Sequence, residues 1–210
     1  MFLAVDIGNV LCDVNFNEFI KELHDKNGFS EFEVWEMLEK VQPHHDLSII
    51  KLGAYLKAEY GVDIDLYPNI MQAWNDSISP NKTSIRYLSA MLDAGVKVAL
   101  LSNMGYEHRK IIKEVIGPAF DRCAQHISCD VGARKPQLLY YQSFLIAYPE
   151  FRGCVYVDDR SENLDTGTRM GFQSVHLDTS KNDAEGIAQA WDAIAQTVLN
   201  RPLYTVQEIK

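Results

Sequence analysis

The sequence lacks long apolar runs, an excess of basic residues and any Cys-x-x-Cys pair. No apolar run approaches the roughly 20 residues of a membrane helix, so we expect no membrane span. The formal net charge of -9 repels nucleic acid and anionic lipid, and we expect neither as a partner. Because no two of the four cysteines form a Cys-x-x-Cys pair, we expect reduced, buried thiols in a cytoplasmic protein and not a zinc or disulfide site.

The N-terminal residues MFLAV have no basic residue before them, and Asp6 interrupts the apolar run. We interpret them as a core strand and not as a signal sequence. The chain of 210 residues is 47% hydrophobic and 23% charged, which is typical of a globular protein. Its length accommodates one buried core and a small accessory domain. A monomer and a homodimer both remain open.

Short apolar runs alternate with helical patterns over much of the chain. The runs cover residues 2–6, 96–102, 126–128, 153–157 and 173–177. The helical patterns cover residues 81–94, 137–147, 161–170 and 184–198. Strands that alternate with helices predict an α/β core, with a parallel sheet of five or six strands and right-handed crossovers.

Residues 15–78 depart from this alternation and contain no convincing strand. Helical stretches are expected near 16–27, 30–41, 48–60 and 66–76, with breaks at Gly28, Pro43 and Gly61. We call residues 15–78 the helical insert. The predicted organisation is a core domain of residues 1–14 and 79–210, with the helical insert as a second domain. The tail, 201–210, is expected to be loosely held.

Polar residues follow three of the predicted strands, at the edge of a parallel sheet where ligands bind. Asp6 ends the first strand, Ser102 the second, and the pair Asp158-Asp159 the fourth. Lys135 lies in a loop before a helix. Singly, each is typical of a cap or a turn. Together they suit phosphoryl transfer, because a phosphate monoester must have its charge offset before a carboxylate attacks it.

Magnesium is the cofactor that this arrangement predicts. Mg²⁺ prefers oxygen ligands and keeps several waters, so two or three protein ligands suffice. Asp6 and the Asp158-Asp159 pair can supply them. Lys135 adds a cation for the phosphate and the nucleophile, and the Ser102 hydroxyl can bind a phosphate oxygen. The expected partner is a small phosphorylated metabolite.

In this order, the four pieces resemble the four motifs of the haloacid dehalogenase (HAD) superfamily. The segments DIGNVL, LLSNMGYEH, DVGARKP and VDDRSENLDTGTRMG look most like phosphatases of the bacterial glucose-1-phosphatase type. The resemblance covers nearly the whole chain, most weakly the helical insert and the tail. It implies a Rossmann-like core with a helical cap domain inserted after the first strand.

The resemblance also implies roles for single residues. Asp6 would form an aspartyl-phosphate that is then hydrolysed. The Gly8 carbonyl and Asp159 would be metal ligands, Asp158 would bind the metal directly or through water, and Asn163 would orient the acidic pair. The expected substrate-binding set comprises Gly8, Asn9, Ser102, Asn103, Lys135 and His108.

The sequence departs from most phosphatases of the superfamily at Gly8, where they carry a general acid-base Asp. General acid-base help is worth roughly 10²–10⁴-fold in rate, so its source matters. His44 and His45 lie in a loop that could reach the site, although a surface position is favoured for both. His108 has the better claim to a substrate contact. Trp35 and Trp74 are expected in the core of the helical insert, with substrate stacking as the alternative.

Three alternatives to a phosphatase compete. A dehalogenase of this fold carries a non-acidic residue in its fourth motif, which the Asp158-Asp159 pair contradicts. A phosphomutase requires the acid that Gly8 replaces. A catalytically weak protein that senses a phosphorylated metabolite remains open because of Gly8.

Overall fold

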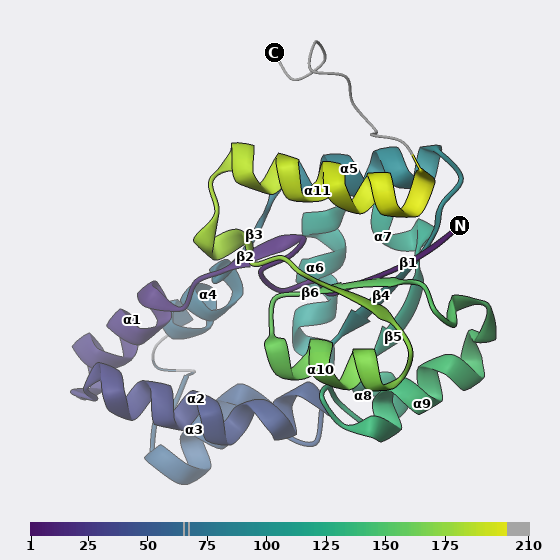
Figure 1. Cartoon of the computed structure of the whole chain (residues 1–210). Coiled ribbons are helices and arrows are strands. Elements are labelled where there is room, and N and C mark those ends of the chain that lie inside the picture. The colour runs from purple at the N-terminus through teal and green to yellow at the C-terminus, as the bar shows by residue number, and fades with distance from the viewer. Residues whose placement is uncertain (65, 67, 201–210) are drawn as a thin grey trace.

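The computed structural model describes residues 1–64, 66 and 68–200 (Figure 1). The tail 201–210, which we expected to be loosely held, lies outside the described residues. Within them, no helix has both the length and the apolar character needed to cross a membrane.

One parallel sheet forms the centre of the protein. Its strands are β1 (Phe2–Val5), β4 (Lys97–Ser102), β5 (Ala124–Ile127), β6 (Val155–Asp158) and β7 (Gln173–His176), in the order β5-β4-β1-β6-β7. The predicted α/β fold with a five-stranded parallel sheet is confirmed. From β1 the chain builds outward to β5, then returns to the other side of β1 for β6 and β7. This change of direction opens a crevice at the carboxyl ends of the central strands.

Helices cover both faces of the sheet (Figure 1). On one face lie α5 (Lys82–Asp93), α6 (Tyr106–Ile116), α7 (Pro118–Arg122) and α11 (Ala184–Leu199). On the other lie α8 (Ser128–Val131), α9 (Leu138–Ala147) and α10 (Ser161–Arg169). Leu3 and Val5 pack on the first face and Ala4 on the second, because side chains alternate along a strand. Both faces of the central strands are buried, which explains why β1, β4 and β6 are mostly apolar, whereas the edge strands β5 and β7 contain polar residues.

The helical insert contains α1 (Asn17–Asn27), α2 (Glu31–Asp46), α3 (Leu52–Tyr60) and α4 (Pro68–Asp76). Figure 1 shows these four helices grouped to one side of the sheet. They bury an apolar cluster of their own, which includes Phe19, Leu23, Met37 and Trp74. Trp74 is therefore core, as expected, whereas Trp35 is 46% exposed.

Two of the three predicted breaks in the helical insert are confirmed. Gly28 and Gly61 end α1 and α3 with φ angles of 75° and 68°, in the left-handed region that favours glycine. The prediction of a break at Pro43 was wrong, because α2 continues through it to Asp46. Proline near the end of a helix removes only one backbone hydrogen bond. Burial of Val41 and His45 on the same helix favours continuation.

A short antiparallel pair of strands was missed. β2 (Cys12–Val14) pairs with β3 (Ile78–Pro80), and Asn15 N donates a further hydrogen bond to Ser77 O at 2.8 Å. The expectation of no strand up to residue 78 was therefore wrong at Ile78. Three-residue strands are too short to show alternation. The pair joins the segment that leads into the helical insert to the segment that leads out.

Candidate active site

Asp6 and Asp158 meet because their strands are neighbours. β1 pairs with β6, and Asp6 N extends this pairing by donating to Val157 O at 2.9 Å. One carboxylate oxygen from each of Asp6, Asp158 and Asp159 lies within 4.8 Å of the other two. Burial raises the pKa of Asp6 well above its ordinary value, and the two neighbouring carboxylates add to the rise.

Lys135 connects two of these carboxylates. Its Nζ lies 2.8 Å from Asp6 Oδ1 and 2.7 Å from Asp158 Oδ2, and its side chain is 1% exposed. Burial works against the charged ammonium, but the two carboxylates outweigh it and raise the pKa of Lys135. We call Asp6, Lys135, Asp158 and Asp159 the strand-end cluster.

Asn103 holds the backbone of Lys135. Its Nδ2 donates to Lys135 O at 2.9 Å, and its Oδ1 accepts from Lys135 N at 2.8 Å. Asn103 lines the cavity, as a substrate-binding residue would, but both of its amide atoms hold the loop that presents the lysine.

Four donors surround Asp158, which is fully buried. Oδ2 accepts from Lys135 Nζ and from the Tyr156 hydroxyl, while Oδ1 accepts from Arg160 N at 3.0 Å and from Asn163 Nδ2 at 2.8 Å. Burial acts to raise the pKa of Asp158, yet Lys135 and the other donors prevail and lower it. Asn163 thus contacts Asp158, one member of the acidic pair that the resemblance expects it to orient. Tyr156 was missed, although its position two residues before Asp158 puts both on the same face of β6.

Asn9 contacts the other member of the acidic pair. Its Nδ2 donates to Asp159 Oδ2 at 3.2 Å, and its Oδ1 accepts from Val14 N at 3.2 Å. The φ of Asn9 is +50°, a left-handed conformation that Asn adopts more readily than most residues. Burial raises the pKa of Asp159. Asn9 thus positions Asp159 while it lines the cavity.

A cavity of about 220 Å³ opens between the strand ends and the helical insert. Nine of the ten predicted site residues line it: Asp6, Gly8, Asn9, Ser102, Asn103, His108, Lys135, Asp159 and Asn163. Asp158 lies behind them. His45 lines the cavity and is buried, whereas His44 is exposed and does not. The favoured surface position therefore holds for His44 and was wrong for His45.

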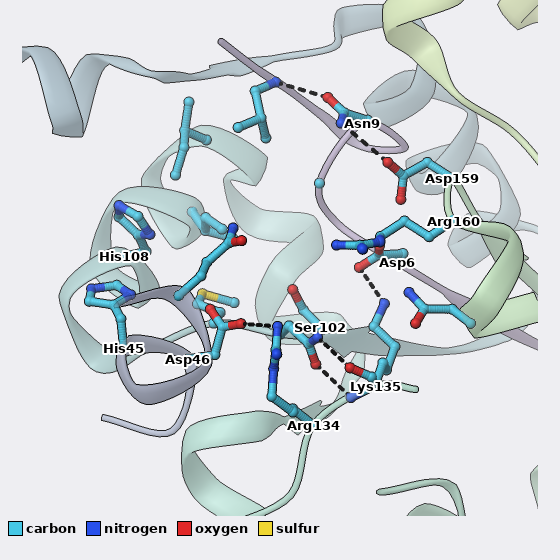
Figure 2. Close-up of a pocket in the computed structure, with 18 of the residues that line it drawn as sticks. Asp6, Asn9, His45, Asp46, Ser102, His108, Arg134, Lys135, Asp159 and Arg160 are labelled. Atoms are coloured by element: carbon cyan, nitrogen blue, oxygen red, sulfur yellow. Dashed lines mark hydrogen bonds and ion pairs between the residues drawn. The ribbon is translucent and has the colours of Figure 1, made fainter. Parts of the chain in front are cut away.

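The side of the cavity that faces the helical insert has a different character, and Figure 2 shows His45 and His108 on it, away from Asp6. The His108 ring stacks on Trp74 with centroids 4.7 Å apart. Burial lowers the pKa of His108 to about 4, with a contribution from His45, so the ring is neutral at pH 7. His45 Nε2 lies 3.2 Å from Glu107 Oε2. We call Gln42, His45, Asp46 and Trp74 of the insert, with His108 and Arg134 of the core, the insert-facing wall.

Asp46 and Arg134 form an ion pair across the boundary between the helical insert and the core. Arg134 Nη2 lies 2.8 Å from Asp46 Oδ2. Burial raises the pKa of Asp46, against the lowering effect of Arg134, His45 and Lys135. The backbone approaches closely here, since a Cβ on Gly105 would lie 2.3 Å from His45 O. Sequence reasoning missed Asp46, because nothing in its local pattern distinguishes it from a solvated helix end.

The strand-end cluster suits a divalent cation. Three carboxylates face the single ammonium of Lys135, and burial of unbalanced negative charge is costly. Oxygen donors of this kind are those that Mg²⁺ prefers. With Asp6 as a buried carboxylate at the cavity surface, the arrangement can bind a phosphate group and present a nucleophile to it.

No protein-family model matches the chain. Among solved structures, it is similar to the HAD family enzyme BT-2542 from Bacteroides thetaiotaomicron in complex with magnesium and inorganic phosphate. The TM-score is 0.73 at 18% identity, over 86% of this chain and 96% of that one. A predicted HAD-like family hydrolase from Porphyromonas gingivalis gives a TM-score of 0.70 at 17% identity, over 86% and 92% of the two chains.

L-2-haloacid dehalogenase from Xanthobacter autotrophicus, with chloropropionic acid covalently bound, is also similar. Its TM-score is 0.60 at 14% identity, over 94% of this chain and 83% of that one. At these identities the likeness establishes the fold, which is that of HAD enzymes. The fold does not determine the reaction, because a phosphate-binding structure and a dehalogenase both share it. The reaction must therefore be argued from the residues of the site.

Proposed function

We propose that the protein is a magnesium-dependent phosphomonoesterase in which Asp6 takes the phosphoryl group. The observation that carries the proposal is the strand-end cluster, with three carboxylates within 4.8 Å and a buried lysine between two of them. The BT-2542 structure with magnesium and phosphate supports it, because that enzyme has the same fold. The sequence resemblance favours a sugar phosphate, such as glucose 1-phosphate, as substrate.

In this proposal an Asp6 carboxylate oxygen attacks phosphorus while the bond from phosphorus to the ester oxygen breaks, and the leaving group departs as an alcohol with a proton from water. A second water then hydrolyses the aspartyl-phosphate, which releases inorganic phosphate and free Asp6. Lys135 holds Asp6 in orientation and offsets charge on the phosphate oxygens. Ser102, at the carboxyl end of β4, donates its hydroxyl to a phosphate oxygen. Bound magnesium would supply further positive charge to the phosphate.

Asp6, Asp159 and the Gly8 carbonyl are the proposed direct metal ligands. The contacts around Asp158 favour an indirect role, since each of its oxygens already accepts two hydrogen bonds. Direct ligation by Asp158 would displace one of those donors. We therefore propose that Asp158 acts through Lys135 and through water.

The helical insert is proposed to act as a cap that closes over the substrate and excludes water. Gln42, His45, Asp46 and Trp74 of the insert line the cavity opposite the strand-end cluster. The short pair of strands β2 and β3 joins it to the core. A movable cap on this stem would admit substrate and then complete the cavity wall.

A panel of sugar phosphates and nucleotides, assayed for phosphate release with Mg²⁺ and again with chelator, tests the proposal. We expect turnover with Mg²⁺ and its loss with chelator. Release of halide from 2-haloacids without metal would instead support the dehalogenase. Tight binding of a phosphorylated metabolite without turnover would support the sensor, the alternative that Gly8 keeps open.

A further inference from the structure

The ion pair between Asp46 and Arg134 lines the cavity on the insert-facing wall. Figure 2 shows it between the two histidines and the strand-end cluster, with the Asp46 carboxylate directed toward Arg134. Asp46 ends α2 of the helical insert, and Arg134 immediately precedes Lys135. A leaving group attached to phosphate at Asp6 would extend toward this pair, because the leaving oxygen lies on the far side of phosphorus from the nucleophile.

Only half of the Asp46 carboxylate is used by the protein. Oδ2 lies 2.8 Å from Arg134 Nη2, and the Asp46 carbonyl accepts from Ser128 Oγ at 2.6 Å. Oδ1 has no hydrogen-bond partner among the described residues. The side chains of Asp46 and Arg134 are 7% and 20% exposed, so the geometry is fixed by burial as well as by charge. One oxygen is held, and the other is available to a ligand in the cavity that Asp46 lines.

We infer that Asp46 selects the leaving group, and that Oδ1 accepts a hydrogen bond from a substrate hydroxyl. The inference rests on the proposed phosphatase function. An ionised carboxylate accepts hydrogen bonds and donates none, so the group that meets it must bring a donor. A second phosphate or carboxylate on the substrate would be repelled, because Asp46 already offsets the charge of Arg134. The preferred substrates are therefore monophosphates of small, uncharged, polyhydroxyl compounds.

The aromatic residues of the cavity argue against nucleotides. Trp74 stacks against Phe16 at a centroid distance of 5.1 Å and against His108 at 4.7 Å, and the residue is only 2% exposed. Trp74 therefore offers no face to a base, and the alternative of substrate stacking on Trp74 is disfavoured. The cavity of about 220 Å³ is also smaller than the roughly 300–1,000 Å³ of pockets that hold drug-sized ligands.

Asp46→Asn tests the assignment when kcat/KM is compared across a hexose monophosphate, a hexose bisphosphate and p-nitrophenyl phosphate, which has no hydroxyl. We expect the preference for the hexose monophosphate over p-nitrophenyl phosphate to fall about tenfold or more, as for the loss of a hydrogen bond to a charged group. Relative turnover of the bisphosphate should rise, because Arg134 loses its partner. The control is Asp130→Asn, which removes a carboxylate 2.8 Å from Arg109 in an exposed pair. It should leave both ratios unchanged.

Equal losses on all three substrates, or unchanged ratios, would overturn the role of Asp46. Asp46→Glu provides a second variant if Asp46→Asn does not fold, since it keeps the charge but moves the oxygens, and it should lower the same preference. Failure of the unmodified protein to hydrolyse any of the three would overturn the proposed function itself. Turnover with unaltered ratios would overturn only the selection by Asp46.

Discussion

The two sides of the cavity differ in how completely their polar atoms are paired. In the strand-end cluster, the ammonium of Lys135 contacts two carboxylates, and both oxygens of Asp158 accept two hydrogen bonds. On the insert-facing wall, Trp74 Nε1, His108 Nε2 and Arg134 Nε are buried without a partner among the described residues.

An unpaired buried polar group costs about 1–3 kcal/mol, which the insert-facing wall would recover if water reached those atoms. The strand-end cluster would lose its ion pairs on any comparable opening. The difference teaches that the core holds a fixed arrangement, suited to stabilising one transition state. On the insert-facing wall, hydration of the unpaired atoms would offset part of the cost of separating the insert from the core, which includes loss of the Asp46–Arg134 ion pair.

Asp6→Asn should produce the largest effect and sharpen the comparison on the core side. We expect kcat to fall by roughly 10³-fold or more, because the nucleophile is lost. Thermal stability should not fall. The pKa of Asp6 is raised by burial, so the ionised carboxylate destabilises the folded state, and the neutral Asn side chain removes this destabilisation. Phosphate release and thermal unfolding measure the two effects. Asp165→Asn, on an exposed position of α10, is the control and should change neither. Retained turnover in Asp6→Asn would contradict the assignment.

Gly8→Asp should restore a general acid-base group and so reduce dependence on the leaving group. A Cβ at Gly8 would meet only Val14 Cγ2 at 3.6 Å, an ordinary contact, and Gly8 lines the cavity. We expect kcat on unactivated alkyl phosphates to rise up to about 10²-fold, the lower end of what such catalysis supplies. Gly8→Ala adds the Cβ without the carboxyl and should not increase it. An equal rate in the two variants would show that the group at position 8 does not limit the reaction.

His108→Gln tests the insert-facing wall through pH. The folded pKa is about 4 and the ordinary value 6.5, so the unfolded state takes up a proton first as pH falls. Stability is therefore lost below pH 6.5, by about 2 kcal/mol at pH 5, since one pKa unit corresponds to about 1.4 kcal/mol. The free energy of unfolding, measured with urea at pH 6.5 and at pH 5, should therefore fall less between these pH values in His108→Gln than in the unmodified protein. The control is His44→Gln at an exposed position. If the free energy of unfolding changes equally with pH in His108→Gln and in the unmodified protein, His108 does not cause this loss of stability.

Tyr156→Phe should have the smallest effect, although it acts on the tightly paired side. It removes one of the two donors to Asp158 Oδ2 and leaves Lys135 as the other. We expect a loss of about 1 kcal/mol in stability and a several-fold decrease in kcat with KM unchanged. Tyr148→Phe, which removes a hydroxyl donor to Gln125 O at 3.4 Å, is the control. It should leave kcat unchanged. A change in KM alone would place Tyr156 in substrate binding.

The strand-end cluster was predictable because local pattern and topology determine it together. Apolar runs mark the strands, and the residues that end parallel strands meet at one edge. Asp6, Lys135 and Asp159 followed from this reasoning, and Asn163 from the resemblance. Tyr156 could have been found by alternation along β6. The residues of the insert-facing wall could not, because helix packing decides that His45 is buried while His44 is exposed.

The antiparallel pairing of β2 with β3 also makes the chain modular. Val14 pairs with Ile78, so the two ends of the intervening segment leave the core side by side. Paired residues in antiparallel strands have Cα atoms only about 5 Å apart, a gap that a tight hairpin turn spans. The four helices between them could thus be exchanged for another insert, or replaced by a turn, without redirecting β1 or α5. The core and the helical insert are thus separable at this one pair of strands, where a different insert could be grafted.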